Sequence, residues 1–254
     1  MNPDHQTMND GLLLDDWLPK IAADSGVELT TVMRQQLLRL AELMREWNQR
    51  INLTANTRDE DIAIRHYLDS LTLVAYLDWY EQVSGQTSPS LIDVGTGAGF
   101  PGLVLKIVRP NWQITLLDSL AKRVRYLQTA ADTLQLTGLA AVHARAEDAG
   151  RQPGLRESFD LATARAVAAL PVLSEYCLPF VRVGGYFLAM KGDPESEWPA
   201  ARSAVDRLGG QRVRTDSFRL PGTDMQRSIF LIKKISSTAE AYPRKAGKPE
   251  NSPL

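Results

Sequence analysis

A glycine-rich turn between two apolar runs is the feature that most constrains the fold. Residues 91–110 read LIDVGTGAGFPGLVLKIVRP, and four glycines fall within eight of these residues. Gly97, Gly99 and Gly102 fit the pattern G-x-G-x-x-G, while the same stretch read from Asp93 fits D-x-G-x-G-x-G. Both patterns describe a strand, a tight turn and a helix that carry a ligand at the turn. The stretch therefore predicts an α/β protein.

Short β-rich runs alternate with helical stretches after this turn. They recur about every 20 to 30 residues, the rhythm of βαβ units and a parallel sheet: LIDVG, QITLLD, AAVHAR, FDLATA and GGYFLAM. Two later runs, QRVRTDSF and QRSIFLIKK, are separated only by RLPGTDM. That linker is too short for a helical crossover, so we expect antiparallel pairing. The expected fold is the α/β, Rossmann-like fold of class I methyltransferases, a seven-stranded and mostly parallel sheet whose last strand is antiparallel.

Three apolar series with helical spacing precede the sheet. They are Leu14, Trp17, Leu18 and Ile21; then Met33, Leu37, Leu40, Met44 and Trp47, with Thr30 or Thr31 as N-cap; then Ile64, Leu68, Leu71 and Ala75. We therefore expect a flexible N-terminus over 1–10, a helical region over 11–83, a linker over 84–90, a ligand-binding domain over 91–235 and a basic, Pro-rich tail over 236–254.

Composition bounds the class of protein. The chain has 254 residues, with 29 Lys and Arg against 30 Asp and Glu, so nucleic-acid binding requires a local basic patch. The apolar runs are far shorter than the ~20 residues that span a bilayer, and MNPDHQTMND lacks the features of a signal peptide. Cys177 is the only cysteine, which excludes an internal disulfide. We expect a cytoplasmic monomer with no metal and no membrane contact.

Asp93 favours one of the two glycine motifs. A carboxylate just before the glycines would repel a pyrophosphate, but it would complement the ammonium and sulfonium groups of S-adenosylmethionine, directly or through water. Gly95, Gly97 and Gly99 would let the backbone turn close to this ligand. A methyltransferase is therefore favoured, and a nicotinamide-dependent oxidoreductase using the same loop is the alternative. A third possibility is that the glycine turn binds no ligand and serves only strand-to-helix packing.

Two more acids follow neighbouring strands. Asp118 ends the second strand, where a carboxylate can accept both hydroxyls of a ribose in either class of enzyme. The third strand leads into ARAEDAG, in which the Ala146 backbone and the carboxylate of Glu147 or Asp148 would meet an adenine. An ordinary helix cap is the structural alternative at this position.

The chain resembles a known family from about residue 47 to residue 235. The resemblance rests on NLTANTRDEDIAIRHYLDSL, VGTGAGFPG, LLDSLAKRVRYL, ARAED, TARAVAAL, MKG and RSIFLIKK, and it extends to YPRKAGKPENSPL in the tail, whose composition alone favours disorder. These motifs resemble the bacterial small-subunit rRNA guanine-7 methyltransferases, the glucose-inhibited division protein B family. The resemblance implies methyl transfer from S-adenosylmethionine to nitrogen 7 of a guanine in the 530-loop region of 16S rRNA, in free RNA or in the 30S subunit.

The resemblance also implies site residues. Donor contacts would come from Gly95, Phe100, Ala146, Glu147 and Arg165, with Asp118 on the ribose. Phe100 stands where some members of the family have leucine, an exchange that keeps an apolar contact.

Basic residues supply the candidates for RNA binding. Lys122, Arg123 and Arg125 open the helix after the second strand, where cations oppose the helix dipole and phosphate binding would explain them. Further candidates are Lys191, Arg227 and Arg244, with Lys245 and Lys248 in the tail. A solvated basic face is the structural alternative for each of them.

The chemistry expected at the acceptor needs no catalytic base. Cys177 lies in an apolar helical stretch, so we expect a core residue rather than the nucleophile that carbon methylation requires. Nitrogen 7 of guanine has a free lone pair and no proton, so alignment suffices and Arg165 would serve as an orienting residue. We expect His66 to be structural, and Asn52 and Asp69 to join the helices to the sheet domain. A donor-binding RNA chaperone is the non-enzymatic alternative.

Overall fold

The computed structural model describes residues 12–165, 167–192 and 197–254, so the expected flexible N-terminus over 1–10 lies outside the described residues. The strands are β1 Ser90–Val94, β2 Gln113–Asp118, β3 Leu139–His143, β4 Phe159–Arg165, β5 Val181–Lys191, β6 Gly210–Arg219 and β7 Gln226–Lys234. The helices are α1 Leu14–Ser25, α2 Thr31–Ile51, α3 Asp59–Asp61, η1 Ile62–Leu68, α4 Asp69–Leu71, α5 Val74–Ser84, α6 Gly102–Val108, α7 Ala121–Thr133, α8 Ala146–Ala149, α9 Leu170–Cys177, η2 Leu178–Phe180, α10 Trp198–Arg207 and α11 Lys248–Asn251.

The seven strands form one sheet in the order β3-β2-β1-β4-β5-β7-β6. β1 lies between β2 and β4 and is parallel to both, whereas β7 is antiparallel to β5 and to β6. The short connection between β6 and β7 allows only this hairpin pairing. The predicted fold is therefore confirmed, including the antiparallel last strand.

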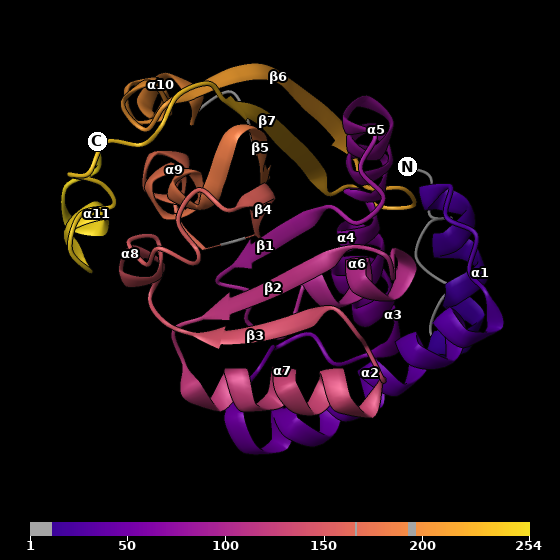
Figure 1. The fold of residues 1–254 in the computed structure, drawn as a ribbon. Helices are drawn as coiled ribbons and strands as arrows, with labels where there is room; N and C mark the ends of the chain where they lie inside the picture. Colours follow the sequence, from indigo (N-terminus) through magenta and orange to yellow (C-terminus); the bar gives the residue numbers. More distant parts are fainter. Residues whose placement is uncertain (1–11, 166, 193–196) are drawn as a thin grey trace, which may run out of the picture.

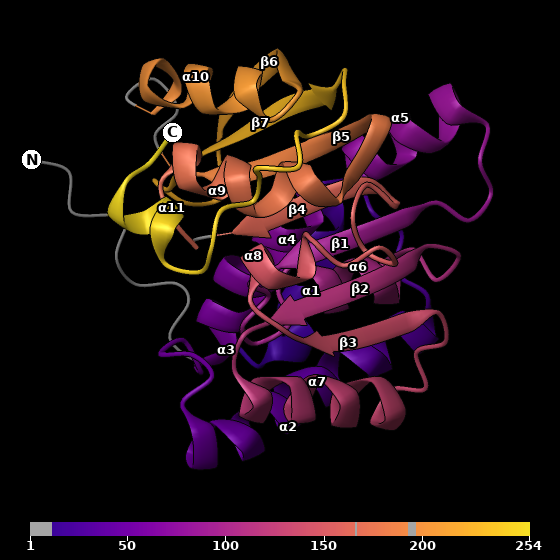
Figure 2. The ribbon, with the colours of Figure 1, turned by 60° about the vertical axis from the view of Figure 1, so that its left-hand side comes forward.

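Helices cover both faces of the sheet, and strand residues alternate between two apolar cores. Leu116 and Leu161 belong to the core that includes α1, α2, α5, α6 and α7, while Leu117 and Ala162 belong to the core that includes α9 and α10. Figures 1 and 2 show the sheet between these two groups of helices. Strands buried on both faces explain why the sequence showed continuous apolar runs.

The N-terminal helices follow the predicted periodicity for two of the three series. The predicted apolar residues of α1 are buried, and Thr30 caps α2 by accepting a hydrogen bond from the Met33 amide at 3.2 Å. The third series is not one regular helix, because η1 is a π-helix. The wider turn shifts the register, so that Ala75 is exposed and Tyr76 is buried instead. No helix of the described residues is both long and apolar enough to cross a membrane.

The C-terminal segment after β7 packs against the sheet domain. The Arg151 guanidinium donates to the carbonyls of Glu240, Ala241 and Pro243. Arg156 makes further bonds of this kind to carbonyls in the segment, and Pro243 is buried. The tail is thus ordered along its described length. The composition of the tail favoured disorder, because composition does not show the arginines in a distant part of the chain that hold the tail in place.

Candidate functional site

Two cavities open where the parallel strands end. The first, the glycine-loop cavity, has a volume of about 290 Å³ and is lined by Val94, Gly95, Leu117, Asp118, Ser119, Arg123, Ala144, Arg145, Ala146, Glu147, Val167, Tyr176 and Glu250. The second, the cationic cavity, has a volume of about 570 Å³ and is lined by Asn56, Arg65, His66, Asp69, Arg165, Met190, Lys191, Gly192, Glu197 and Arg227. Ligands of open parallel sheets bind at this edge.

Asp93 lies beneath the glycine turn and does not line the glycine-loop cavity, which corrects direct contact, one of the two modes that we expected for it. It is fully buried, and its Oδ2 accepts hydrogen bonds from the Thr96 hydroxyl at 2.6 Å and the Gly102 amide at 2.9 Å. Asp93 therefore fastens the two ends of the turn. Burial raises its pKa to about 6. Its Oδ1 is buried without a hydrogen-bond partner among the described residues.

Gly95 gives the glycine-loop cavity its room. Its φ is +71°, and a Cβ at this position would lie 2.8 Å from a methyl carbon of Val167, another wall of the cavity. A side chain at Gly95 would thus be strained and would fill the space for a ligand. Gly97 and Gly99 also have positive φ, but they shape the turn and do not line the cavity.

Asp118 ends β2 and lines the glycine-loop cavity. Its Oδ2 accepts from the Gly97 amide at 3.0 Å, and its Oδ1 accepts from the Leu120 amide at 2.9 Å. A carboxylate has about four acceptor positions. The geometry therefore fixes the side chain and leaves positions for a ligand.

Glu147 and Ala146 line the far end of the same cavity, whereas Asp148 is exposed and does not line it. Of the two acids that the sequence left open, the structure brings Glu147 to the cavity. Tyr176 and Glu250 lie there as well, and sequence reasoning missed both. Neither belongs to a motif, and both reach the cavity only through the packing of α9 and the tail.

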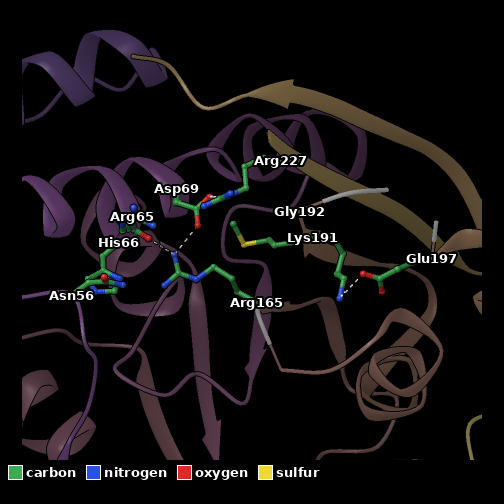
Figure 3. Close-up of a pocket in the computed structure, with 10 residues that line it drawn as sticks. Asn56, Arg65, His66, Asp69, Arg165, Lys191, Gly192, Glu197 and Arg227 are labelled. Atoms are coloured by element: carbon green, nitrogen blue, oxygen red, sulfur yellow. Dashed lines mark hydrogen bonds and ion pairs between the residues drawn. The ribbon is translucent and has the colours of Figure 1, made fainter. Parts of the chain in front are cut away.

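Ion pairs organise the cationic cavity. Asp69 is buried and accepts from Arg165 at 2.9 Å through Oδ2 and from Arg227 at 2.7 Å through Oδ1. Lys191 pairs with Glu197 at 3.0 Å. Figure 3 shows Asp69 between the two guanidinium groups, and Lys191 turned toward Glu197. Asp69 thus joins the helical region to β4 and β7, as expected.

Arg165 and Phe100, both predicted to contact the donor, lie on the cationic side. Arg165 lines the cationic cavity, and its guanidinium carbon is 5.8 Å from the centre of the Phe100 ring. Phe100 is buried and stacks on the His66 imidazole, with ring centres 4.5 Å apart and planes 4° apart. Burial and the nearby Arg165 charge lower the pKa of His66 to about 4. His66 is therefore neutral at pH 7, in agreement with a structural role.

Asn52 does not join the helices to the sheet as we expected. It is exposed and ends α2 in the left-handed conformation, with φ of 47°. Cys177 is fully buried, and burial raises the pKa of its thiol well above the ordinary value. The expectation of a core cysteine is confirmed.

The cations predicted to bind RNA occupy different environments. Lys122 and Arg125 are exposed on α7, whereas Arg123 lines the glycine-loop cavity with one guanidinium nitrogen 3.5 Å from Asp118. Lys191 and Arg227 line the cationic cavity. Arg244 forms a bidentate ion pair with Glu175, whose side chain is 1% exposed. The structure thus engages Arg244 within the fold, while Lys245 and Lys248 are exposed.

Comparison with known proteins gives a consistent result. The family model described as "rRNA small subunit methyltransferase G" matches residues 33–229. The chain is 44% identical over 233 residues to ribosomal RNA small subunit methyltransferase G of Acetivibrio thermocellus, covering 92% of this chain and 93% of that protein. It is 46% identical over 243 residues to the protein of that name from Alkaliphilus oremlandii, covering 95% and 99%.

Solved structures are similar at the level of the fold. The branched-chain polyamine synthase of Thermus thermophilus aligns with a TM-score of 0.52 and 14% identity, over 67% of this chain and 57% of that chain.

Proposed function

The chain belongs to the rRNA small subunit methyltransferase G family, and from that premise we propose that it transfers a methyl group from S-adenosylmethionine to a guanine of 16S rRNA. The finer proposal is transfer to nitrogen 7, in the 530-loop region. The observation that supports it most is the pairing of two cavities at one edge of the sheet. One presents acidic side chains and a glycine turn, and the other presents arginine and lysine side chains.

The glycine-loop cavity fits the methyl donor. The room beside Gly95 and the free acceptor positions of Asp118 suit a nucleoside that presents ribose hydroxyls, and Glu147 suits the amine of its adenine. When bound, S-adenosylmethionine supplies a methyl group on a positively charged sulfur. Asp118 would hold the ribose and Glu147 the base, while Asp93 keeps the turn in shape from below.

The cationic cavity suits the acceptor RNA. Asp69 holds Arg165 and Arg227 in fixed positions, and a cation fixed by a buried carboxylate needs little further ordering when it binds a phosphate or a guanine oxygen. Guanine nitrogen 7 already has a free lone pair, so the residues of this cavity only need to align it with the methyl group. The neutral imidazole of His66 stacks on Phe100, and the proposed reaction requires no proton transfer from it.

Tritium transfer tests the proposal directly. Methyl-labelled S-adenosylmethionine is incubated with the protein and with either naked 16S rRNA or 30S subunits lacking the modification. We expect label in the RNA, and we expect mass mapping to place it on a guanine of the 530-loop as 7-methylguanine. Label on another nucleotide would contradict the finer proposal. Tight NAD binding without label transfer would favour the oxidoreductase, and donor binding without transfer would favour the chaperone.

Two details complete the proposal. A 16S rRNA substrate places the enzyme in the cytoplasm. Both cavities are built from residues of one chain, so we propose that a monomer suffices. A mass of 28.2 kDa in light scattering, with full transfer activity, would agree with this.

A further inference from the structure

The C-terminal segment reaches the glycine-loop cavity. The segment follows β7, which lies between β5 and β6 in the sheet, and it contains the short helix α11 near its end. Figure 2 shows α11 beside α9 and α8, on the side toward which the arrowheads of β2 and β4 point. Glu250 of this helix lines the cavity. A segment remote in sequence from the glycine turn therefore forms part of the same binding space.

Two hydrogen bonds connect the segment to the acidic end of the cavity. The Tyr176 hydroxyl donates to Glu250 Oε1 at 3.1 Å, and the Gly247 amide donates to Glu147 Oε1 at 3.0 Å. Burial and the charge of Glu147 raise the pKa of Tyr176, so the phenol stays protonated and remains a donor. Glu147 and Glu250 are thereby held near the same end of the cavity, each with a second carboxylate oxygen to offer.

The segment is anchored strongly enough to place Glu250 in a defined position. Arg244 forms a bidentate pair with buried Glu175, and its backbone amide also donates to Glu175 at 2.7 Å. The Gly247 contact to Glu147 then follows three residues later. A residue that binds a ligand must be held in position by supporting contacts, and these contacts hold the backbone on the N-terminal side of Glu250.

We infer that Glu250 is a specificity residue of the methyl-donor site, which accepts a hydrogen bond from the exocyclic amine of the donor's adenine. The inference rests on the proposed function. An adenine amine carries two hydrogens and only donates, and ionised carboxylates only accept, so Glu147 and Glu250 can each take one hydrogen. A purine with an oxygen at the same position would place one acceptor against two other acceptors, so it would form neither hydrogen bond and would bind less well. Tyr176 and the docked segment position Glu250 for this discrimination.

Calorimetric binding of two product analogues tests the inference. S-adenosylhomocysteine carries the amine, and S-inosylhomocysteine carries an oxygen in its place. In Glu250→Gln, binding of S-adenosylhomocysteine should weaken by about threefold to tenfold, as expected for the loss of one hydrogen bond. The preference for the adenosyl compound should narrow as well, because a glutamine amide can donate to the oxygen. Glu240→Gln is the matched control, since Glu240 and Glu250 are both exposed acids of the same segment but Glu240 lines neither cavity.

Hydrogen exchange gives an independent measurement on the wild-type protein. S-adenosylhomocysteine should slow exchange of the amides of residues 247–251, because the ligand and the docked segment share contacts. No binding of S-adenosylhomocysteine to the wild type would contradict the proposed function itself. Binding by the wild type with unchanged affinity and unchanged preference in Glu250→Gln would overturn the inference alone. Unchanged exchange on ligand binding would also count against it.

Discussion

At the scale of single residues, the acids around the glycine turn have distinct roles. Asp93 is buried and holds the turn together, while Asp118 both supports the turn and faces the cavity. A carboxylate near a glycine motif can therefore act on the backbone rather than on the ligand. Only the hydrogen-bond geometry separates the two cases, since Asp118 ends β2, Asp93 is one residue from the end of β1, and both lie next to the same loop.

Replacing Asp118 by Ala should weaken binding of S-adenosylhomocysteine by about tenfold to a hundredfold, through the loss of charged hydrogen bonds to the ribose. The Gly97 and Leu120 amides would also lose their acceptor, which adds to the effect. Titration calorimetry measures it. Asp132→Ala, an exposed acid on α7, is the control. Equal affinities of Asp118→Ala and wild type would contradict the placement of the ribose.

His66 should make folding stability depend on pH. Its pKa is about 4 in the folded protein against 6.5 ordinarily, so between these values the unfolded chain binds a proton that the folded chain does not. Stability due to His66 is therefore lost as the pH falls through this window. The free energy of unfolding of wild type, relative to His66→Asn, should fall by about 2 kcal/mol between pH 6.5 and 5.

Urea denaturation of both proteins measures this difference. Asp93 titrates in the opposite sense, since its folded pKa of about 6 exceeds its ordinary 3.8, but it is present in both proteins and cancels. A difference that stays constant with pH would mean that His66 is not buried as a neutral ring.

At the scale of elements, the basic side chains at the start of α7 lie in two different environments, the solvent and the glycine-loop cavity. Lys122 and Arg125 face solvent and Arg123 faces the glycine-loop cavity, although all three open the same helix. The sequence predicted all three at the start of the helix after the second strand, near the donor site, but of the three only Arg123 lines either cavity. It did not separate them, because helical spacing turns consecutive residues by about 100° and only the packing of α7 decides which side meets β2.

The double variant Lys122→Gln with Arg125→Gln should weaken RNA binding and reduce its salt dependence. Each lost phosphate contact lowers the slope of log affinity against log salt by about 0.9 for duplex RNA, and by less for single strands. Filter binding over a salt series measures the slope. Arg202→Gln, an exposed cation of α10, should leave it unchanged. Arg123→Gln should instead affect donor binding. Unchanged slopes in the double variant would leave α7 as a solvated face.

The tail element depends on Arg244 for its attachment. Arg244→Met leaves the buried Glu175 carboxylate without its partner, which should cost about 3 to 5 kcal/mol of unfolding free energy. Adding Glu175→Gln to this variant should recover a large part of the loss. Urea denaturation measures both. Unchanged stability together with weaker RNA binding would instead restore the role that the sequence suggested for Arg244.

At the scale of the whole molecule, the two cavities would, under the proposed function, bring donor and acceptor together without a group that must titrate during the reaction. His66 is neutral above about pH 5, and Lys234, whose pKa burial lowers to about 8, lines neither cavity. Single-turnover methylation should therefore be nearly independent of pH between about 7 and 9. Rapid-quench measurements with saturating donor and 30S subunits test this. A limb of unit slope that disappears in His66→Asn would show a required base.

The sequence by itself determined the fold class, the antiparallel pairing of the last two strands and the edge of the sheet at which the site lies. Glycines that need positive φ, apolar runs of strand length and a linker too short for a crossover are local signals, and each allows few structures. The same signals identified Asp118, because an acid at the end of a parallel strand must lie at the ligand edge. After the third strand they left Glu147 and Asp148 open, and only the structure brings Glu147 to the cavity.

The tertiary structure alone decided which side chains share a cavity. Asp69 meets Arg227 across 158 residues, and Glu250 meets Tyr176 across 74 residues. Such pairs have no spacing rule, since they depend on how helices and the tail pack against the sheet. The tail shows this most clearly. Its composition indicates a solvated segment, but buried Glu175 and the guanidinium groups of Arg151 and Arg156 hold it against the sheet domain, where Glu250 lines the glycine-loop cavity.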